Sequence, residues 1–342
     1  MDAIAQLDDA GKALRILYSS TDRVAGQGLL AASGAVCFPK SKPGPSGWPV
    51  IAWAHGTTGT SDECAPSRKA RPDRDATYLN TWLREGYVVV AADYQGLGIA
   101  GPHPYLHARA QACSGFDAER TVLGMDGVSN RVAIVGQSQG AGAAFATASY
   151  AQRYAPDIDL RGTLATGTPN LGRPDPTPVP ADRVDTGLAY VIYAAATVQL
   201  LNPASADLDL FTSNELPAFK HSARACVWEM FDQIRKERLT SQSTLVPGAM
   251  LKMLRAAGPS IRYPTLKLSK PIFTGIGGAD IDVSTAQQIQ LSDDACKAGT
   301  DVVKHVYQGL HHSETVNASL PDSMPFVLAL FAGISAVSTC GT

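Results

Sequence analysis

A serine at the centre of a Gly-x-Ser-x-Gly motif is the side chain best suited to chemistry in this chain of 342 residues. Ser138 follows the apolar run 132–135, Val-Ala-Ile-Val, and precedes a run of small residues at 140–144. Glycines two residues to either side permit a sharp strand-to-helix turn that holds a serine hydroxyl clear of its own strand. Ser138 is therefore a candidate nucleophile for acyl transfer, and the alternative is an ordinary glycine-rich turn.

An acid and a base follow further along the chain, as serine chemistry requires. The apolar run 271–276 leads into Gly-Gly-Ala-Asp, which ends at Asp280, and the run 302–307 leads into Gln-Gly-Leu-His-His. Loops at the carboxyl ends of neighbouring strands converge, and hydrolases on open α/β sheets use the order Ser, Asp, His. Only one of the adjacent His311 and His312 can face the site, and the residues alone leave that choice open.

Other acids near Asp280 are Asp282, Asp293 and Asp294. The last two fall inside a helix that Ser284 can cap and that ends at Gly299, so we expect them to face solvent. Asp280 directly follows the glycine pair and is the preferred candidate.

Donors for an oxyanion are expected in two places. The first is the backbone N–H of Gln139, directly after the candidate nucleophile, and the second is a loop after an early strand. The run 49–54 leads into His-Gly-Thr-Thr-Gly at 55–59, where we choose Thr57, with Thr58 in reserve. His55 precedes the serine in the chain, so we expect it to brace this loop by hydrogen bonding.

A literal G-x-G-x-x-G stands at 96–101, yet it does not predict a dinucleotide site. Such a site needs a helix to open at the third glycine, whereas Pro-His-Pro follows at 102–104 and disfavours helix. We therefore expect no cofactor. We also expect no metal, because no further ligands stand at a suitable spacing from the Asp280 and histidine candidates.

The segments that must position these residues are predicted to be strands that alternate with helices. Several apolar runs are nearly continuous, which is typical of parallel strands covered on both faces. A helix that Asp75 can cap is expected to end at Gly86. The pattern predicts a mostly parallel, doubly wound α/β sheet. The predicted strands are 28–37, 49–54, 87–92, 132–136, 163–167, 271–276 and 302–307.

About a hundred residues separate two of these strands, although a crossover needs only about a dozen. The segment opens with prolines and carries the apolar run Leu188–Leu201 and a charged helix at 231–239. We predict a catalytic domain at 1–169 and 266–342 with an inserted helical cap or lid at 170–265. The run Leu188–Leu201 is either a wall for an acyl group or a core helix. The opening prolines are those at 169, 174, 176, 178 and 180.

Bulk properties limit the partners and the compartment. A net charge of −2 without long charged runs disfavours nucleic acid and anionic membrane surfaces as partners, and 45% apolar residues permit a sizeable core. The first nine residues carry no signal peptide, and Met1 could replace a removed leader. The run 187–201 is too short for a confident membrane span. Six dispersed cysteines allow up to three disulfides or none.

Taken together, these residues resemble the secretory lipase family, the lipase-A-like branch of the α/β-hydrolases. The most distinctive piece is Asp-Tyr-x-Gly-Leu-Gly at 93–98 with His-Pro-Tyr at 103–105, which accounts for the G-x-G-x-x-G pattern at 96–101. The family's late motifs resemble Gly-Thr-Ala-Asp-x-x-Val-Pro and Tyr-x-Gly-x-x-His, which place the acid on Asp280 and the base on His312. Gly278 and Ser284 depart mildly from the first motif. The other matching segments are 14–20, 55–59, 136–140, 277–283 and 307–312.

The resemblance implies the α/β-hydrolase fold, a helical cap, and secretion with some cysteines bridged. The expected function is a serine carboxylic-ester hydrolase that forms an acyl-enzyme on Ser138 and acts on a small-molecule or lipid ester. Contact of the cap with a lipid interface is also an expectation. The alternatives are a peptidase or acyltransferase on the same scaffold, or a non-catalytic binding protein. The expected compartment is extracellular or periplasmic, with the cytoplasm still open. The natural ester, the disulfide pairing and the oligomeric state stay open.

Overall fold

A single eight-stranded sheet forms the centre of the computed structural model, which describes residues 7–24, 26, 28–171, 179–202, 210–213 and 216–341. The strand order is β1-β2-β4-β3-β5-β6-β7-β8. The first two strands pair antiparallel with their neighbours, and the remaining pairs are parallel. The predicted doubly wound α/β sheet is therefore confirmed. The strands are β1 (Ala10–Thr21), β2 (Leu29–Pro39), β3 (Trp48–Ala54), β4 (Val88–Ala92), β5 (Val128–Gln137), β6 (Leu160–Thr166), β7 (Ile272–Gly277) and β8 (Val302–Tyr307).

Helices cover both faces of the sheet, which explains why the strand sequences are continuously apolar. Within β3, Val50 packs into one core cluster with Phe116 of α2, whereas its neighbour Ile51 packs into the other with Trp82 of α1. Each inner strand therefore buries consecutive residues on opposite faces. The flanking helices are α1 (Asp73–Arg84), α2 (Ala108–Leu123), α3 (Gln139–Tyr154), α9 (Thr285–Lys297), α10 (Glu314–Ala318) and α11 (Leu320–Phe331).

One predicted helix cap is right and one is wrong. The Ser284 side chain accepts a hydrogen bond from the backbone N–H of Gln287, so it caps α9 as expected. In contrast, α1 begins two residues before Asp75, with Pro72 at the cap position. Asp75 lies in the first turn and pairs with Arg74 instead. Pro72 suits the position before the helix because its ring fixes φ at a value compatible with a helix start.

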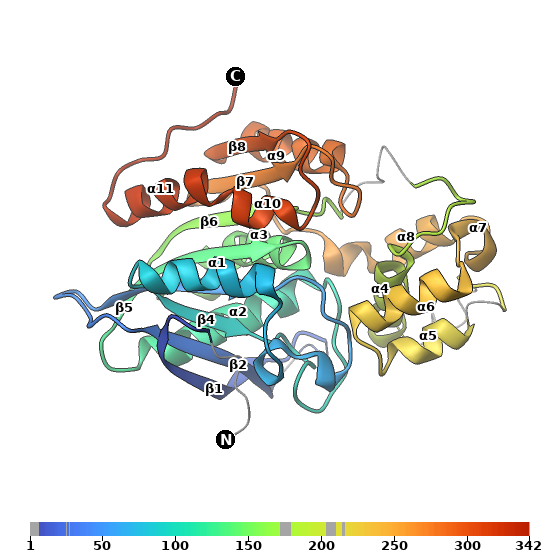
Figure 1. Ribbon diagram of the computed structural model, residues 1–342, viewed down its shortest axis with the longest axis horizontal. Coiled ribbons are helices and arrows are strands. Elements are labelled where there is room, and N and C mark those ends of the chain that lie inside the picture. The colour runs from blue at the N-terminus through green and yellow to red at the C-terminus, as the bar shows by residue number, and fades with distance from the viewer. Residues whose placement is uncertain are drawn as a thin grey trace.

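The chain between β6 and β7 forms a separate group of helices, which Figure 1 shows gathered on one side of the sheet. They pack into two apolar clusters that are distinct from the sheet's own cores. The central helix α4 contributes to both clusters, through Tyr193 in one and Val198 in the other. The 170–265 boundaries of a cap domain stay a prediction, and the prolines at 174, 176 and 178 lie outside the described residues. The helices are α4 (Leu188–Leu201), α5 (Leu216–Ser222), α6 (Val227–Glu237), α7 (Ser241–Thr244) and α8 (Ala249–Ile261).

Disulfides join distant parts of the chain. Cys64, in the short 3-10 helix η1 (Asp62–Cys64), is bonded to Cys226 directly before α6. Cys296 of α9 is bonded to Cys340 near the end of the chain. The first bond thus ties the α4–α8 group to a loop of the sheet domain. The free cysteines among the described residues are Cys37 and Cys113, and both are buried.

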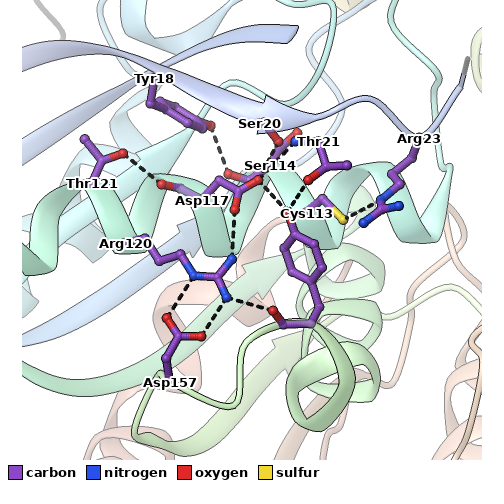
Figure 2. Close-up of polar contacts among 11 residues, drawn as sticks. Tyr18, Ser20, Thr21, Arg23, Cys113, Ser114, Asp117, Arg120, Thr121 and Asp157 are labelled. Carbon is purple, nitrogen blue, oxygen red and sulfur yellow. Dashed lines mark hydrogen bonds and ion pairs between the residues drawn. The ribbon is translucent and has the colours of Figure 1, made fainter. Parts of the chain in front are cut away.

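A polar cluster fastens the antiparallel edge of the sheet to its helices (Figure 2). Asp117 of α2 accepts hydrogen bonds from Ser20 Oγ and Thr21 N of β1. The same carboxylate accepts from Tyr154 at the end of α3 and from Arg120. We name this set the Asp117 cluster; its members are Ser20, Thr21, Asp117, Arg120, Tyr154 and Asp157.

Candidate active site

Ser138 stands at the junction of β5 and α3 in a strained conformation, with φ 59° and ψ −123°. A Cβ on Gly136 would overlap the carbonyl group of Gly140, and a Cβ on Gly140 would overlap the carbonyl of Ala54. The two glycines are therefore required by close backbone packing. The Ser138 N–H donates to the carbonyl of Thr166 in the neighbouring strand, at 2.9 Å. This geometry is that of a nucleophile elbow.

Asp280 and His312 form a buried pair. The Nδ1–H of His312 donates to Asp280 Oδ2 at 2.7 Å, and their side chains are 7% and 0% exposed. Asp280 Oδ1 accepts the backbone N–H groups of Asp282 and Val283, both at 3.0 Å, while Gln288 Nε2 donates to Oδ2 at 2.8 Å. These donors fix the direction of the carboxylate.

The other ring nitrogen of His312 is free to act as a base. When Nδ1 carries the proton, Nε2 presents a lone pair. His312 Nε2 is buried and has no hydrogen-bond partner within the described part of the chain. Ser138 and His312 line the same cavity, so this lone pair and the candidate nucleophile share one space.

The rival residues take other roles. His311 is exposed, and its Nδ1 hydrogen-bonds with the carbonyl of Ala279 at 2.8 Å, so His312 and not His311 contacts Asp280. Asp293 pairs with Lys304 and Asp294 pairs with Lys297.

Asp282 lies close enough to Asp280 and His312 to suggest a metal site. One potential ligand atom from each of the three lies within 4.8 Å of the others. Both oxygens of Asp280, however, already accept hydrogen bonds, two on Oδ1 and two on Oδ2. The arrangement fits a carboxylate that orients a histidine better than one that holds a metal.

The two expected oxyanion donors lie beside Ser138. Gln139 is the first residue of α3, so its N–H has no partner within the helix. Thr57 lines a cavity together with Ser138 and Gln139. The side chain of Thr57 hydrogen-bonds with the phenol of Tyr105 at 2.8 Å, which fixes the loop that presents its N–H.

His55 makes the bracing contacts expected from the sequence. Its Nδ1 lies 2.7 Å from the carbonyl oxygen of Gly56 and its Nε2 lies 3.3 Å from that of Asp93. The ring stacks on Tyr94, with 4.3 Å between centroids. Burial lowers the pKa of His55, which keeps the ring neutral and suited to a structural role.

Sequence reasoning missed several supporting residues. Gln288 orients Asp280 through the bond already described. Gly167 follows β6 with φ +67°, and a Cβ there would lie 2.6 Å from His312 Cε1, so only glycine leaves room for the imidazole. His103 Nε2 accepts from the Gln139 side-chain amide at 3.4 Å, and burial lowers the pKa of His103 to about 4. His103 and Tyr105 stand in the His-Pro-Tyr signature, which was the available signal.

Two cavities share Ser138, Thr57 and Tyr190 in their walls. The smaller, of about 420 Å³, also contains His312 and apolar side chains from α6. The larger, of about 740 Å³, contains Gln139 and apolar side chains from α4 and α8. A substrate could therefore extend to two sides of Ser138. The α4–α8 residues in these walls are Tyr190, Val191, Val227, Trp228, Phe231, Arg235 and Met250.

Comparison with known proteins agrees with this fold. Residues 69–201 match the family model of secretory lipases. The closed state of Candida antarctica lipase A superimposes with a TM-score of 0.76 and 17% identity, covering 96% of this chain and 80% of that one. A putative hydrolase from Legionella pneumophila gives 0.77 and 18%, covering 95% and 90%. The rice cell wall degrading esterase LipA from Xanthomonas oryzae gives 0.69 and 19%, covering 93% and 89%. No curated protein sequence matches.

The fold and the family match define a carboxylic-ester hydrolase of the α/β-hydrolase class. More particularly, the match over residues 69–201 confirms the resemblance to the secretory lipase family. This family and the two disulfides indicate an extracellular protein. Within the described residues, no helix has the length and apolar character needed to cross a membrane.

Proposed function

We propose that this protein hydrolyses carboxylic esters through an acyl-enzyme on Ser138, with His312 as general base and acid and Asp280 as its orienting carboxylate. One observation carries the proposal: a buried Asp280–His312 pair leaves the His312 Nε2 lone pair unpartnered in a cavity that Ser138 also lines. A histidine held in this way is poised to accept the proton of a nearby hydroxyl.

The reaction follows from the position of each group. Ser138 Oγ attacks the ester carbonyl while His312 Nε2 takes its proton, and the Asp280 carboxylate stabilises the imidazolium. The N–H groups of Gln139 and Thr57 stabilise the tetrahedral oxyanion, each by roughly 3 kcal/mol. His312 then protonates the departing alcohol oxygen. A water molecule, deprotonated by His312, releases the acid and restores Ser138.

The same proposal assigns the helical segment. Residues 1–169 and 266–342 form the catalytic domain, and 170–265 form a cap whose side chains wall both cavities. Its apolar residues, such as Tyr190 and Phe231, suit the organic parts of an ester. Secretion fits a substrate outside the cell. A lipid and a plant-wall ester are both candidates, because the similar structures are described as a lipase and as a cell-wall-degrading esterase.

The test is the variant Ser138→Ala assayed on p-nitrophenyl esters, with Ser129→Ala as the matched control. Ser129 lies earlier on β5 and donates to the Trp48 carbonyl, away from both cavities. We expect kcat to fall by at least about 10,000-fold for Ser138→Ala and to stay near wild type for the control. A fluorophosphonate probe should label Ser138. Retained turnover by Ser138→Ala, or labelling elsewhere, overturns the mechanism. Matched ester and amide substrates separate an esterase from a peptidase.

A further inference from the structure

We propose that the smaller cavity receives the alcohol part of the ester, and that Arg71 selects alcohols or phenols that carry an anionic group such as a carboxylate. The inference rests on the proposed roles of Ser138 and His312, and it names the substrate class of that same site. It is argued from the position of His312, the unpaired state of Arg71, and the walls of the cavity.

The proton transfer assigns the two cavities. His312 must protonate the departing alcohol oxygen, so that oxygen has to lie on the side of Ser138 where His312 is found. His312 lines the smaller cavity, whereas the described lining of the larger cavity contains Gln139 and not His312. The alcohol therefore leaves into the smaller cavity, and the larger cavity holds the acyl group.

Arg71 is the unusual cation of the smaller cavity. Its Nε is buried without a hydrogen-bond partner, and within the described chain none of its nitrogens makes an ion pair or hydrogen bond. Two other arginines in the wall are neutralised: Arg74 pairs with Asp75 at 2.7 Å, and Arg235 pairs with Asp232 at 3.1 Å. Arg71 is only partly exposed, and a buried guanidinium nitrogen without a partner is costly. An anion with the geometry of a carboxylate would satisfy it with paired hydrogen bonds.

The local charge also favours an anion. The chain as a whole carries −2, yet the wall of this cavity presents Lys69 and Arg71. Its acids are Asp75, which pairs with Arg74, and the exposed Asp282, which has no salt bridge among the described residues. The charge of Arg71 also acts on His55, which lines the same cavity. Burial is the main cause that lowers the pKa of His55, and the charge of Arg71 lowers it further. Excess charge in a cleft with apolar walls attracts ligands of opposite sign.

The rest of the wall fits the body of such an alcohol. Val227, Trp228 and Phe231 of α6 supply apolar and aromatic surface beside the cation. The cavity therefore suits an aryl or alkyl alcohol whose apolar part packs on α6 and whose charged end meets Arg71. A neutral alcohol would leave Arg71 unpaired and bind less well.

The test compares two acetate esters that share an acyl group and differ in charge, 4-acetoxybenzoate and 4-acetoxybenzamide. We expect Arg71→Gln to lower kcat/KM for the anionic ester at least about tenfold relative to the neutral ester, mainly through KM, because the contact is made before reaction. Arg71→Lys should retain part of the preference. Arg68→Gln is the matched control, since Arg68 pairs with Glu63 and is outside the cavity wall.

A second pair of substrates tests the assignment of the cavities. Phenyl hemisuccinate carries its charge on the acyl side, and phenyl butanoate is its neutral counterpart. Their ratio of kcat/KM should not change in Arg71→Gln. In the wild type, the preference for 4-acetoxybenzoate should fall as salt rises from 10 to 300 mM, because salt screens the attraction.

Three results overturn the inference: equal losses on both acetates, a loss specific to the hemisuccinate, or a preference that salt leaves unchanged. The salt measurement uses the wild type, so it tests the inference even if Arg71→Gln does not fold. Failure of the proposed function looks different, because neither acetate would then depend on Ser138. A wild-type enzyme that uses Ser138 on both acetates without preference contradicts only the role of Arg71.

Discussion

The Asp117 cluster and the candidate active site both contain charged side chains, but they differ in how their polar atoms are paired. In the Asp117 cluster, one carboxylate accepts four hydrogen bonds, and Arg120 also binds Asp157 at 2.6 Å (Figure 2). In the candidate active site, His312 Nε2 and Arg71 Nε are buried without a partner within the described chain. An unpartnered buried polar group costs about 1–3 kcal/mol, so such groups need another justification.

The difference separates a structural task from a chemical one. The Asp117 cluster joins β1, α2 and the end of α3, and its hydrogen bonds are complete without any other molecule. In the candidate active site, His312 Nδ1 is paired with Asp280, whereas its Nε2 has no partner within the described chain. In these two regions, complete pairing accompanies a structural role, and missing pairing accompanies a cavity that a substrate could enter.

The largest effect is expected from Asp280→Asn, which replaces one carboxylate oxygen by an amide nitrogen in the candidate active site. The amide can still accept from Val283 N, but its NH₂ would face the Nδ1–H of His312 and the Gln288 amide. His312 must then change tautomer, and Nε2 loses its lone pair. We expect kcat on p-nitrophenyl esters to fall about 10,000-fold, while the thermal unfolding midpoint changes little.

The matched control is Asp293→Asn, which removes a carboxylate within α9 that pairs with Lys304. Its kcat should stay near wild type, since a partly exposed ion pair contributes less than about 1 kcal/mol to stability and nothing to the site. An Asp280→Asn enzyme with nearly normal kcat would remove Asp280 from the mechanism.

The reverse outcome is expected in the Asp117 cluster. Asp117→Ala removes the acceptor of four hydrogen bonds and leaves Ser20, Tyr154 and Arg120 without it. We expect the free energy of unfolding, measured by urea titration, to fall by about 3 kcal/mol. Active-site titration with a fluorophosphonate should give unchanged kcat per folded molecule. A loss of kcat with unaltered stability would contradict the assignment of a structural role to the Asp117 cluster.

The sequence predicted the parts of the site that local patterns encode. The elbow at Ser138 has a short motif, and Asp280 and the histidine pair follow consecutive strands in the order that the sheet requires. The choice of His312 over His311 needed the family resemblance, because adjacent residues share the same local pattern. The structure separates them by the direction of each ring, toward Asp280 or toward the carbonyl of Ala279.

Features that depend on distant contacts could not be predicted. Strand β1 was missed because it is an edge strand with alternating exposed and buried residues and no continuous apolar run. The Cys64–Cys226 bond spans 162 residues, and no spacing rule selects it among the alternatives. Arg71 looks like any loop arginine until the fold places it in the wall of a cavity that also contains His312.

Glu119 tests whether a missing hydrogen-bond partner always marks function. Glu119 of α2 is 1% exposed, and neither carboxylate oxygen has a partner within the described residues. It nevertheless lines neither of the cavities that contain Ser138. Burial raises the pKa of Glu119 well above its ordinary value, and the nearby Asp117 raises it further although Arg120 opposes this.

This raised pKa makes folding depend on pH in a known direction. Below the pKa of a glutamate in the unfolded chain, about 4.3, Glu119 is protonated in both the folded and the unfolded state, so it adds no pH dependence to the free energy of unfolding. Above it, the unfolded state releases the proton while the folded state keeps it, so the wild type loses up to about 1.4 kcal/mol per pH unit until the folded pKa is passed. Glu119→Gln removes this loss, so its advantage in the free energy of unfolding should grow between pH 4.5 and 7.

Urea titrations at pH 4.5, 5.5 and 7 measure this advantage, with Glu85→Gln as the control. Glu85 is exposed at the end of α1, so its substitution should leave the pH dependence within about 0.5 kcal/mol of wild type. The kcat of Glu119→Gln should equal that of the wild type. A missing hydrogen-bond partner would then indicate function only for polar atoms of residues that line a cavity. An advantage that does not change with pH would contradict the raised pKa, and a large fall in kcat would extend the active site to the far end of α2.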